Sequence, residues 1–481
     1  MIGTIKKLDT IKMLIGENWI ETEDKFPVEN PYSGRAIFEV SCANKAHVYK
    51  ALESAEIGKE ISKNLSPYQR SEIISKVVLL LKERREEFSK IIVSEGIKTI
   101  NESRKEVDRC INTLTLCAEE AKRHNGEMIS FNAFQGSEKR TGYYVHSPIG
   151  IITAITPFND PLNLVAHKLG PAIASGNAII IKPSDFTPVS AIKLSKLFIE
   201  AGLPYHIINI ITGPISNFGD ILVTDSRVNM VSFTGGTRTG EAIIKTAGIK
   251  KVAMELGSSS PVIVMEDAAI DEVAENCIGA IIWAAGQNCV GVKRLYVHEA
   301  VYDQFKEKLV ALANDVAIGN PEDITTDMGP IISNTAIQNI EESVLELEKE
   351  GYKILCGGRR VKNNYLPTIL EGDFDHCLNG KQEIFGPVAT LSKIKSLDEG
   401  ITASNDSPYG LHAGIFTANI NMAFKATEQL NCGGVMVNDS SDYRIDMMPF
   451  GGVKQSGIGR EGVASAMKEM TTTKVVCFNL K

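Results

Sequence analysis

One of the nine cysteines in this sequence lies where a thiol can meet a substrate. Cys289 follows an apolar, helix-like run, 278–285, and precedes a strand-like run, 293–297, so we expect it at a helix-to-strand junction. The thiolate is the nucleophilic form of cysteine, and a polar, partly open position behind Gly-Gln-Asn favours it. The sequence therefore predicts a nucleophile at Cys289, against the alternative of a buried, inert cysteine.

Two polar residues elsewhere in the chain can assist such a nucleophile. Glu255 is predicted to end the strand 251–254, and a glutamate among apolar residues has a raised pKa that suits it to accept a proton from a thiol or a water. Asn159 follows Thr-Pro-Phe at another strand end, where its amide can donate to a developing oxyanion together with the backbone N–H of Cys289. The alternatives are an exposed turn glutamate and an ordinary turn asparagine.

The segments that carry these residues alternate between strand-like and helix-like patterns. From residue 149 to residue 255 the strands are short and apolar, which indicates a parallel sheet covered by helices on both faces. A second alternation begins at Pro261 and continues to strands near Val388, Gly414 and Val435. We therefore predict two α/β halves that meet near residues 255–260, and a junction between domains is a common place for a substrate.

Candidate dinucleotide contacts fall at the carboxyl ends of the first set of strands, where open α/β sheets bind ligands. The fingerprint G-x-G-x-x-G is absent, but Gly235 and Gly236 stand between a strand and a helix N-terminus, which favours an anion. Lys182 can bind ribose hydroxyls, and Asp185 would repel a 2′-phosphate, which favours NAD over NADP. A plain αβ turn and a helix-start aspartate are the alternatives. The predicted cofactor contacts, including a later loop, are Ile155, Thr156, Pro157, Phe158, Lys182, Ser184, Asp185, Gly213, Phe233, Thr234, Gly235, Gly236, Thr239, Leu256, Glu383 and Phe385.

Length and composition restrict the class of protein. A chain of 481 residues is too long for one hydrophobic core, so two or three domains are expected. The net charge of −8 argues against a nucleic-acid partner. Sparse cysteines indicate a reducing compartment, and because no Cys/His spacing completes a zinc site we predict no metal. No segment has the apolar length of a signal peptide core or a membrane span, so we expect a cytoplasmic protein without membrane contacts.

Two segments fit neither half. Gly126 to Tyr144 leads into a strand-like stretch, and the tail from Thr471 to Phe478 alternates in the same way. Because strand edges of this kind are liabilities unless they are paired, we expect these segments to pair with each other or with another subunit.

Four motifs in order along the chain resemble the aldehyde dehydrogenase superfamily: Met254-Glu255-Leu256-Gly257, Gly286-Gln287-Asn288-Cys289, Glu383-Ile384-Phe385-Gly386-Pro387 and Pro449-Phe450-Gly451-Gly452-Val453-Lys454-Gln455-Ser456-Gly457. The resemblance spans nearly the whole chain. It implies an α/β fold with a Rossmann-type NAD(P)-binding domain at 1–126 and 146–255, a catalytic domain at 256–455, and a small β oligomerisation element at 127–145 and 465–481. It also implies a homodimer or a homotetramer.

The resemblance further implies a reaction in four steps, with NAD as the cofactor and NADP as the alternative. Cys289 attacks an aldehyde, and Asn159 and the Cys289 amide hold the oxyanion of the thiohemiacetal. Hydride then passes to NAD(P)+, and Glu255 activates a water that hydrolyses the thioester to the carboxylic acid.

The segment 440–450 is similar to that of lactaldehyde dehydrogenases and of relatives that act on phosphonoacetaldehyde and sulfolactaldehyde. Arg444, and Arg109 as a second candidate, are therefore predicted to contact an anionic or hydroxyl group of the substrate, with a salt-bridged loop arginine as the alternative. Asn288 is the third predicted substrate contact, and it stands where phosphate-using relatives carry arginine. Asp160 would repel an anion if it points inward. We expect a short polar or hydroxylated aldehyde, with an anionic one as the alternative.

Two other functions stay open at this point. In a CoA-acylating aldehyde dehydrogenase the thioester passes to CoA, but Glu255 argues against this reaction because only hydrolysis needs a water-activating base. A non-catalytic binding or structural protein of the same fold is the second, and the intact pair of Cys289 and Glu255 argues against it.

Overall fold

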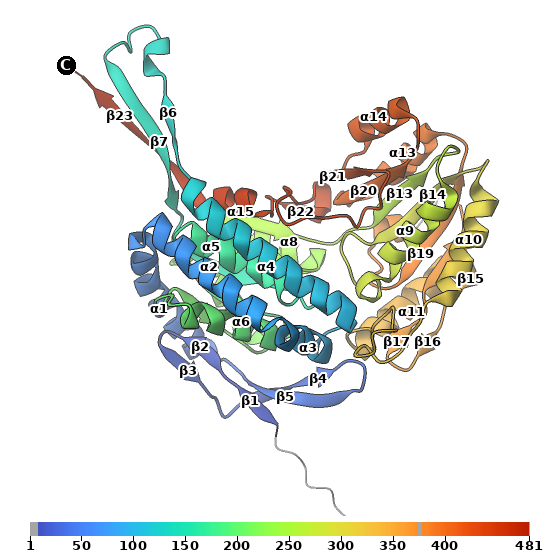
Figure 1. Cartoon of the computed structure of the whole chain (residues 1–481), viewed down its shortest axis with the longest axis horizontal. Coiled ribbons are helices and arrows are strands. Elements are labelled where there is room, and N and C mark those ends of the chain that lie inside the picture. The colour runs from blue at the N-terminus through green and yellow to red at the C-terminus, as the bar shows by residue number, and fades with distance from the viewer. Residues whose placement is uncertain (1–7, 374–377, 481) are drawn as a thin grey trace, which may run out of the picture.

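The computed structural model describes residues 8–373 and 378–480, so the predicted domain limits at 1 and 481 lie outside the described residues. Figure 1 shows two α/β lobes joined side by side, with a long β arm projecting from the first lobe. Among the described residues no helix combines the length and apolarity that crossing a membrane requires.

The first lobe is built on a six-stranded sheet with the order β10-β9-β8-β11-β12-β22. The first five strands are parallel, as predicted, while β22 from near the end of the chain adds antiparallel to β12. This alignment brings the carboxyl ends of β8, β9 and β11 to one edge. The bounds are β8 (Ile151–Ile155), β9 (Ala178–Lys182), β10 (Ile208–Ile210), β11 (Met230–Thr234), β12 (Lys251–Glu255) and β22 (Gly457–Ile458).

Helices cover both faces of this sheet, which confirms the prediction from its apolar strands. Ile179 and Ile181 of β9 pack into one core with α2, α4, α5 and α6, whereas Ile180 points into the opposite core with α1, α7 and α8. The helices are α1 (Lys45–Asn64), α2 (Pro67–Glu83), α3 (Arg85–Glu95), α4 (Ile100–Arg123), α5 (Asn163–Ala174), α6 (Pro188–Glu200), α7 (Gly219–Thr224) and α8 (Thr237–Ala247).

Helix α4 begins with a reciprocal cap that also bears on the site. Thr99 accepts a hydrogen bond from the backbone of Glu102, and the Glu102 carboxylate accepts one from the Thr99 N–H, so two N–H groups at the helix start are satisfied. The side chains of Glu102, Glu106 and Arg109 then follow at helical spacing and face the second lobe and α5.

The second lobe carries a seven-stranded sheet with the order β15-β18-β19-β14-β13-β20-β21, in which β15 alone of the described strands is antiparallel to its neighbour. The chain passes from β12 in the first sheet to β13 in the second through residues 256–259. The strands are β13 (Ser260–Val264), β14 (Val292–His298), β15 (Lys353–Cys356), β18 (Thr368–Glu371), β19 (Val388–Ile394), β20 (His412–Phe416) and β21 (Gly434–Val437). The helices packed on it are α9 (Ile270–Ile282), α10 (Tyr302–Asp315), α11 (Asn334–Lys349), α13 (Leu397–Asn405) and α14 (Ile420–Gln429).

The projecting arm is a three-stranded antiparallel sheet with the order β23-β7-β6 (Figure 1). β7 (Arg140–Pro148) pairs along its whole length with β23 (Thr471–Asn479), and β6 (Glu127–Ile129) covers the other edge. The sequence left open whether these two segments pair with each other or with another subunit. In the structure they pair with each other. Local sequence patterns cannot predict this pairing, because the two strands lie far apart in the sequence.

Candidate functional site

A cavity of ≈ 820 Å³ lies between the lobes, a volume in the usual range for a ligand site. Its wall is formed by α4 and by the segments after β8, β11 and β12, together with loops of the second lobe. All three residues predicted to be catalytic line it, and so do all three predicted substrate contacts: Asn159, Glu255, Cys289, Arg109, Asn288 and Arg444.

The chain reaches Cys289 through a left-handed turn. The sequence predicted that the helix continues to Ala285, which is wrong, because α9 ends at Ile282 and Ala284 and Ala285 take φ of 53° and 52°. This region costs a non-glycine residue roughly 1–2 kcal/mol. Buried Glu102 of the first lobe accepts the Ala284 N–H at 2.8 Å. A contact between the lobes therefore stabilises the turn that presents Cys289.

Gln287 fixes the same loop from within the second lobe. Its buried amide donates to the carbonyl oxygens of Ala284 and Pro330, each at 3.2 Å, and its Oε1 accepts the Ile332 N–H at 3.1 Å. Gln287 thus stays inside the protein while Asn288 and Cys289 reach the cavity.

Cys289 is half-buried, and its surroundings do not favour the thiolate. Burial raises the pKa of the thiol to about 12, the positive charge of Arg444 opposes this, and the carboxylates Glu383 and Glu255 raise it further. In this arrangement Cys289 carries its proton at neutral pH, so nucleophilic chemistry requires a group that accepts that proton.

Two carboxyl groups near the thiol have pKa values that are shifted in opposite directions. Burial and the neighbouring Glu461 raise the pKa of Glu255 well above its usual range, and its Oε2 has no hydrogen-bond partner. Burial would also raise the pKa of Glu461, but Lys168 at 2.6 Å and Arg444 at 3.1 Å hold it well below its usual range. A pair of titratable groups whose pKa values are shifted in opposite directions is typical of acid–base sites.

Half of the predicted cofactor contacts line the cavity. Gly236 is the N-cap of α8, which has no side-chain cap, and a Cβ at Gly236 would meet nothing within 4 Å. A phosphate can therefore approach the free N–H groups of this helix start. The lining members are Pro157, Phe158, Thr234, Gly235, Gly236, Leu256, Glu383 and Phe385.

The other predicted cofactor contacts lie outside the cavity wall, at or near the ends of β8, β9, β10 and β11, except Thr239 in the first turn of α8. Lys182 ends β9, and its Nζ lies 2.5 Å from Asp185 Oδ1 and 3.0 Å from the Pro183 carbonyl. Ribose hydroxyls would share this ion pair, so the residues fit a dinucleotide that extends along the strand ends. These residues are Ile155, Thr156, Lys182, Ser184, Asp185, Gly213, Phe233 and Thr239.

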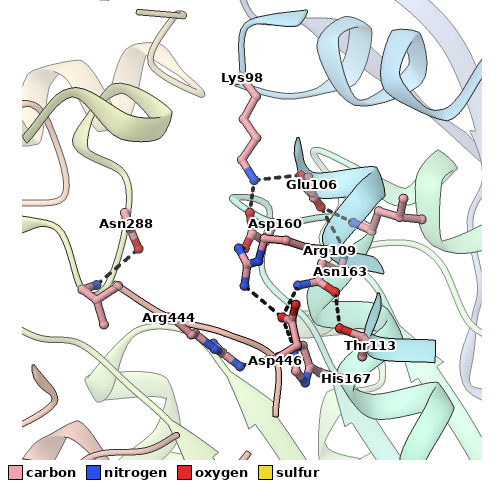
Figure 2. A network of polar contacts seen from close by, with 12 residues as sticks. Lys98, Glu106, Arg109, Thr113, Asp160, Asn163, His167, Asn288, Arg444 and Asp446 are labelled. Atoms are coloured by element: carbon pink, nitrogen blue, oxygen red, sulfur yellow. Dashed lines mark hydrogen bonds and ion pairs between the residues drawn. The ribbon is translucent and has the colours of Figure 1, made fainter. Parts of the chain in front are cut away.

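Figure 2 shows the ion pairs on the substrate side of the cavity. Asp160 contacts Lys98 closely and lies 3.3 Å from Nη1 of Arg109, whose Nη2 lies 3.2 Å from Asp446. Asp160 lines the cavity, where we expected its negative charge to repel an anionic substrate. The positive charges of Lys98 and Arg109 offset this repulsion.

The two arginines differ in accessibility. The Arg444 side chain is 9% exposed and forms a salt bridge with Glu461, which was the alternative to a substrate contact. Its Cζ lies 3.7 Å from the centre of the Phe450 ring. Arg109 is 26% exposed and has longer ion pairs. Asn288 donates a short hydrogen bond to Asp442, which also lines the cavity.

Sequence reasoning missed Lys168, Glu461 and Asp442. Lys168 lies in the fully buried helix α5, and a lysine in an otherwise nearly apolar helix was a signal that could have marked it. Its contact with Glu461 spans 293 residues of sequence, and no local pattern predicts such a pair. Within residues 8–373 and 378–480 no cluster of His, Cys, Asp or Glu could hold a metal ion.

Residues 19–476 match the model of the aldehyde dehydrogenase family. The chain therefore belongs to this family, and it is an NAD(P)-dependent aldehyde dehydrogenase, as its motifs predicted.

Several relatives resemble the chain over nearly its full length. It is 45% identical over 459 residues to aspartate-semialdehyde dehydrogenase 1 of Pseudomonas canavaninivorans, covering 95% of this chain and 97% of that protein. It is 43% identical to 3-sulfolactaldehyde dehydrogenase of Priestia megaterium, covering 97% and 98%, and 42% identical to lactaldehyde dehydrogenase of Methanocaldococcus jannaschii, covering 97% and 100%.

Solved structures share the fold. Aldehyde dehydrogenase 21 from Physcomitrella patens, in complex with the reaction product succinate, superposes with a TM-score of 0.95 at 35% identity, covering 98% of this chain and 99% of that one. Glyceraldehyde-3-phosphate dehydrogenase GapN from Methanocaldococcus jannaschii, complexed with NADP, gives 0.91 at 41% identity, covering 96% and 100%. The predicted α/β fold class is confirmed.

The turn before Cys289 gives a stability prediction. Gly286 has φ of 68°, and a Cβ there would lie 2.2 Å from the Gly386 carbonyl group, so Gly286→Ala should cost more than about 1 kcal/mol in the free energy of unfolding and slow alkylation of Cys289. The control is Gly279→Ala on α9, where a Cβ meets nothing within 4 Å and the helix should gain up to about 1 kcal/mol. Urea unfolding and iodoacetamide labelling measure both. Equal behaviour of the two variants would contradict the role assigned to Gly286.

Proposed function

We propose that this enzyme oxidises short polar or hydroxylated aldehydes to carboxylic acids with NAD+, with Cys289 as nucleophile and Glu255 as base. One observation carries the proposal. A single cavity receives a thiol, a buried carboxyl group and the Asn159 amide from three separate segments of the chain.

Each step of this reaction can be assigned to a residue on the cavity wall. The Cys289 sulfur adds to the aldehyde carbon, and the thiol proton passes to solvent water as the carbon–sulfur bond forms. The Asn159 amide and the Cys289 N–H donate to the oxyanion that forms. When bound, NAD+ accepts the hydride that leaves this carbon. Glu255 then takes a proton from a water that attacks the thioester, the carbon–sulfur bond breaks to release the acid, and the proton returns to the Cys289 thiolate.

Cofactor binding is proposed at the groups that fit it. The start of α8 at Gly236 suits the pyrophosphate, while Glu383 and Phe385 suit the nicotinamide ribose and ring. Asp185 beside Lys182 would repel a 2′-phosphate, which supports NAD over NADP.

Substrate binding is proposed on the opposite wall. Arg109 is the more accessible guanidinium and Arg444 the more buried one, so an anionic or hydroxyl group of the substrate would meet Arg109 first. Asn288, the third proposed contact, adjoins the nucleophile. The names of the relatives, which act on aspartate semialdehyde, 3-sulfolactaldehyde and lactaldehyde, support a short aldehyde with a polar end.

The domain division is also a proposal, with the cofactor domain at 1–126 and 146–255, the catalytic domain at 256–455 and the arm segments 127–145 and 465–481 as an oligomerisation element. Exposed apolar side chains on the arm suit a homodimer or homotetramer, and among them are Met128, Phe134, Val475, Phe478 and Leu480.

Substitution of the two central residues tests the proposal. With NAD+ or NADP+ and a panel of short aldehydes, Cys289→Ala should abolish NADH or NADPH formation, by on the order of 10⁴-fold or more, because no other group forms the thiohemiacetal. Glu255→Gln should lower kcat by about 10²–10⁴-fold. Cys432→Ala is the matched control, a half-buried thiol outside this cavity, and should keep the parent's rate.

Other outcomes would favour the alternatives. A parent enzyme that forms NADH only when CoA is present would indicate the acylating reaction. A parent as inactive as Cys289→Ala on every aldehyde would indicate a non-catalytic protein.

The charge of Glu461 gives a prediction for pH dependence. Glu255 acts as a base in hydrolysis only when ionised, so kcat should rise as the pH rises through its pKa. Glu461→Gln removes the negative charge that raises this pKa and leaves Lys168 and Arg444, which lower it. The rising limb of the pH profile should therefore move to lower pH. Glu428→Gln removes the same charge from the exposed surface of α14 and should leave the profile in place. A shift to higher pH in Glu461→Gln would contradict this account.

A further inference from the structure

The catalytic cavity contains a carboxylate that has no cationic partner. Asp442 lines the wall, and one of its oxygens accepts a short hydrogen bond from Asn288 Nδ2. No described lysine, arginine or histidine forms an ion pair with it. Burial raises its pKa to about 6, with Asn288 and then Arg109 opposing, so it is largely ionised at neutral pH.

The other carboxylates on the substrate side are compensated. Asp160 has Lys98 and Arg109, and Glu461 has Lys168 and Arg444. Asp442 is half-buried, and the cations that act on it, Arg109 and Lys98, form their ion pairs with other carboxylates. A positive group that arrives from the cavity could therefore form the close ion pair that Asp442 lacks among the described residues.

The arginines beside it also retain unused hydrogen-bonding capacity. The Nε atoms of Arg109 and Arg444 are buried and have no hydrogen-bond partner, and Arg444 is nine-tenths buried at the cavity wall. The same wall thus offers an unpaired carboxylate and guanidinium groups, a combination that matches a ligand carrying both signs of charge.

We infer that the preferred substrate is a short aldehyde that ends in an α-amino acid group, with its ammonium on Asp442 and its carboxylate on Arg109. This inference rests on the proposed function, since it assigns the substrate class of that site. Asn288 acts as a positioning residue, because its amide holds Asp442 in place from the position next to Cys289. A cation at position 288 would pair with Asp442 and cancel the charge that the substrate needs.

Three aldehydes of equal length isolate the ammonium group: 4-oxobutanoate, its 2-hydroxy derivative and its 2-amino derivative. For the parent enzyme, kcat/KM should be highest for the 2-amino compound, by about 10-fold or more over 4-oxobutanoate, since its ammonium adds a charge-assisted hydrogen bond. The 2-hydroxy compound, which can donate to Asp442 without charge, should lie between.

Asp442→Asn removes the charge and keeps the shape. It should bring the ratio of kcat/KM between the 2-amino compound and 4-oxobutanoate close to one, mainly through KM for the 2-amino compound. Asp315→Asn is the control, because it removes the same charge from the exposed end of α10, outside the cavity, and should leave the ratio unchanged. Thermal unfolding checks that both variants fold.

The possible failures are distinguishable. If 4-oxobutanoate is used as well as the 2-amino compound, or if Asp442→Asn lowers kcat/KM equally for both, the inference is wrong while the proposed function stands. The same holds if only aldehydes without an amino group are oxidised. If no aldehyde of the wider panel yields NADH or NADPH, the proposed function fails as well.

Discussion

The burial of two carboxylates on one face of α4 is the constraint on which the site depends. Glu102 and Glu106 are almost fully buried one helical turn apart, and each must find hydrogen-bond donors or leave an uncompensated charge worth about 3–5 kcal/mol. Glu102 finds its donor in Ala284, at the turn before the nucleophile, while Glu106 takes two N–H groups at the start of α5 and the ammonium of Lys98. The next turn of the same helix brings Arg109 to the substrate wall. One helix of the first lobe thereby positions the Cys289 loop, the α5 start and Arg109, the proposed substrate contact, together.

A second constraint follows from the charges behind the cavity. Lys168 and Arg444 stabilise the ionised form of Glu461, and burial together with this negative charge raises the pKa of Glu255 well above its usual range. The thiol of Cys289 is likewise held in its neutral form by burial. The pKa values of Glu255 and Cys289 are thus both raised beside a fixed charge pair, and under the proposed function the ionisation of Glu255 sets the pH dependence.

The α/β fold and the main candidates of the site could be predicted from sequence because their signals are local. Apolar strands that alternate with helices place Glu255 at a strand end, and the Gly-Gln-Asn context marks Cys289. Features that depend on contacts between residues far apart in the sequence could not be predicted. The turn at Ala284 looked like a helix because its conformation is imposed from the other lobe, and the Lys168–Glu461 pair joins residues far apart in sequence. The pairing of β7 with β23 was predicted only as one of two choices, since alternation shows that an edge needs a partner but not which one.

We propose that Cys289 carries the substrate as a thioester that Glu255 helps to hydrolyse. The most direct test is mass spectrometry of Glu255→Gln after mixing with NAD+ and an aldehyde that the parent enzyme oxidises. We expect a rapid release of about one NADH per site. We also expect an acyl group on the Cys289 peptide, which persists because its hydrolysis is slow. Release of NADH with no acyl group on Cys289, or with the acyl group on another residue, would contradict the account.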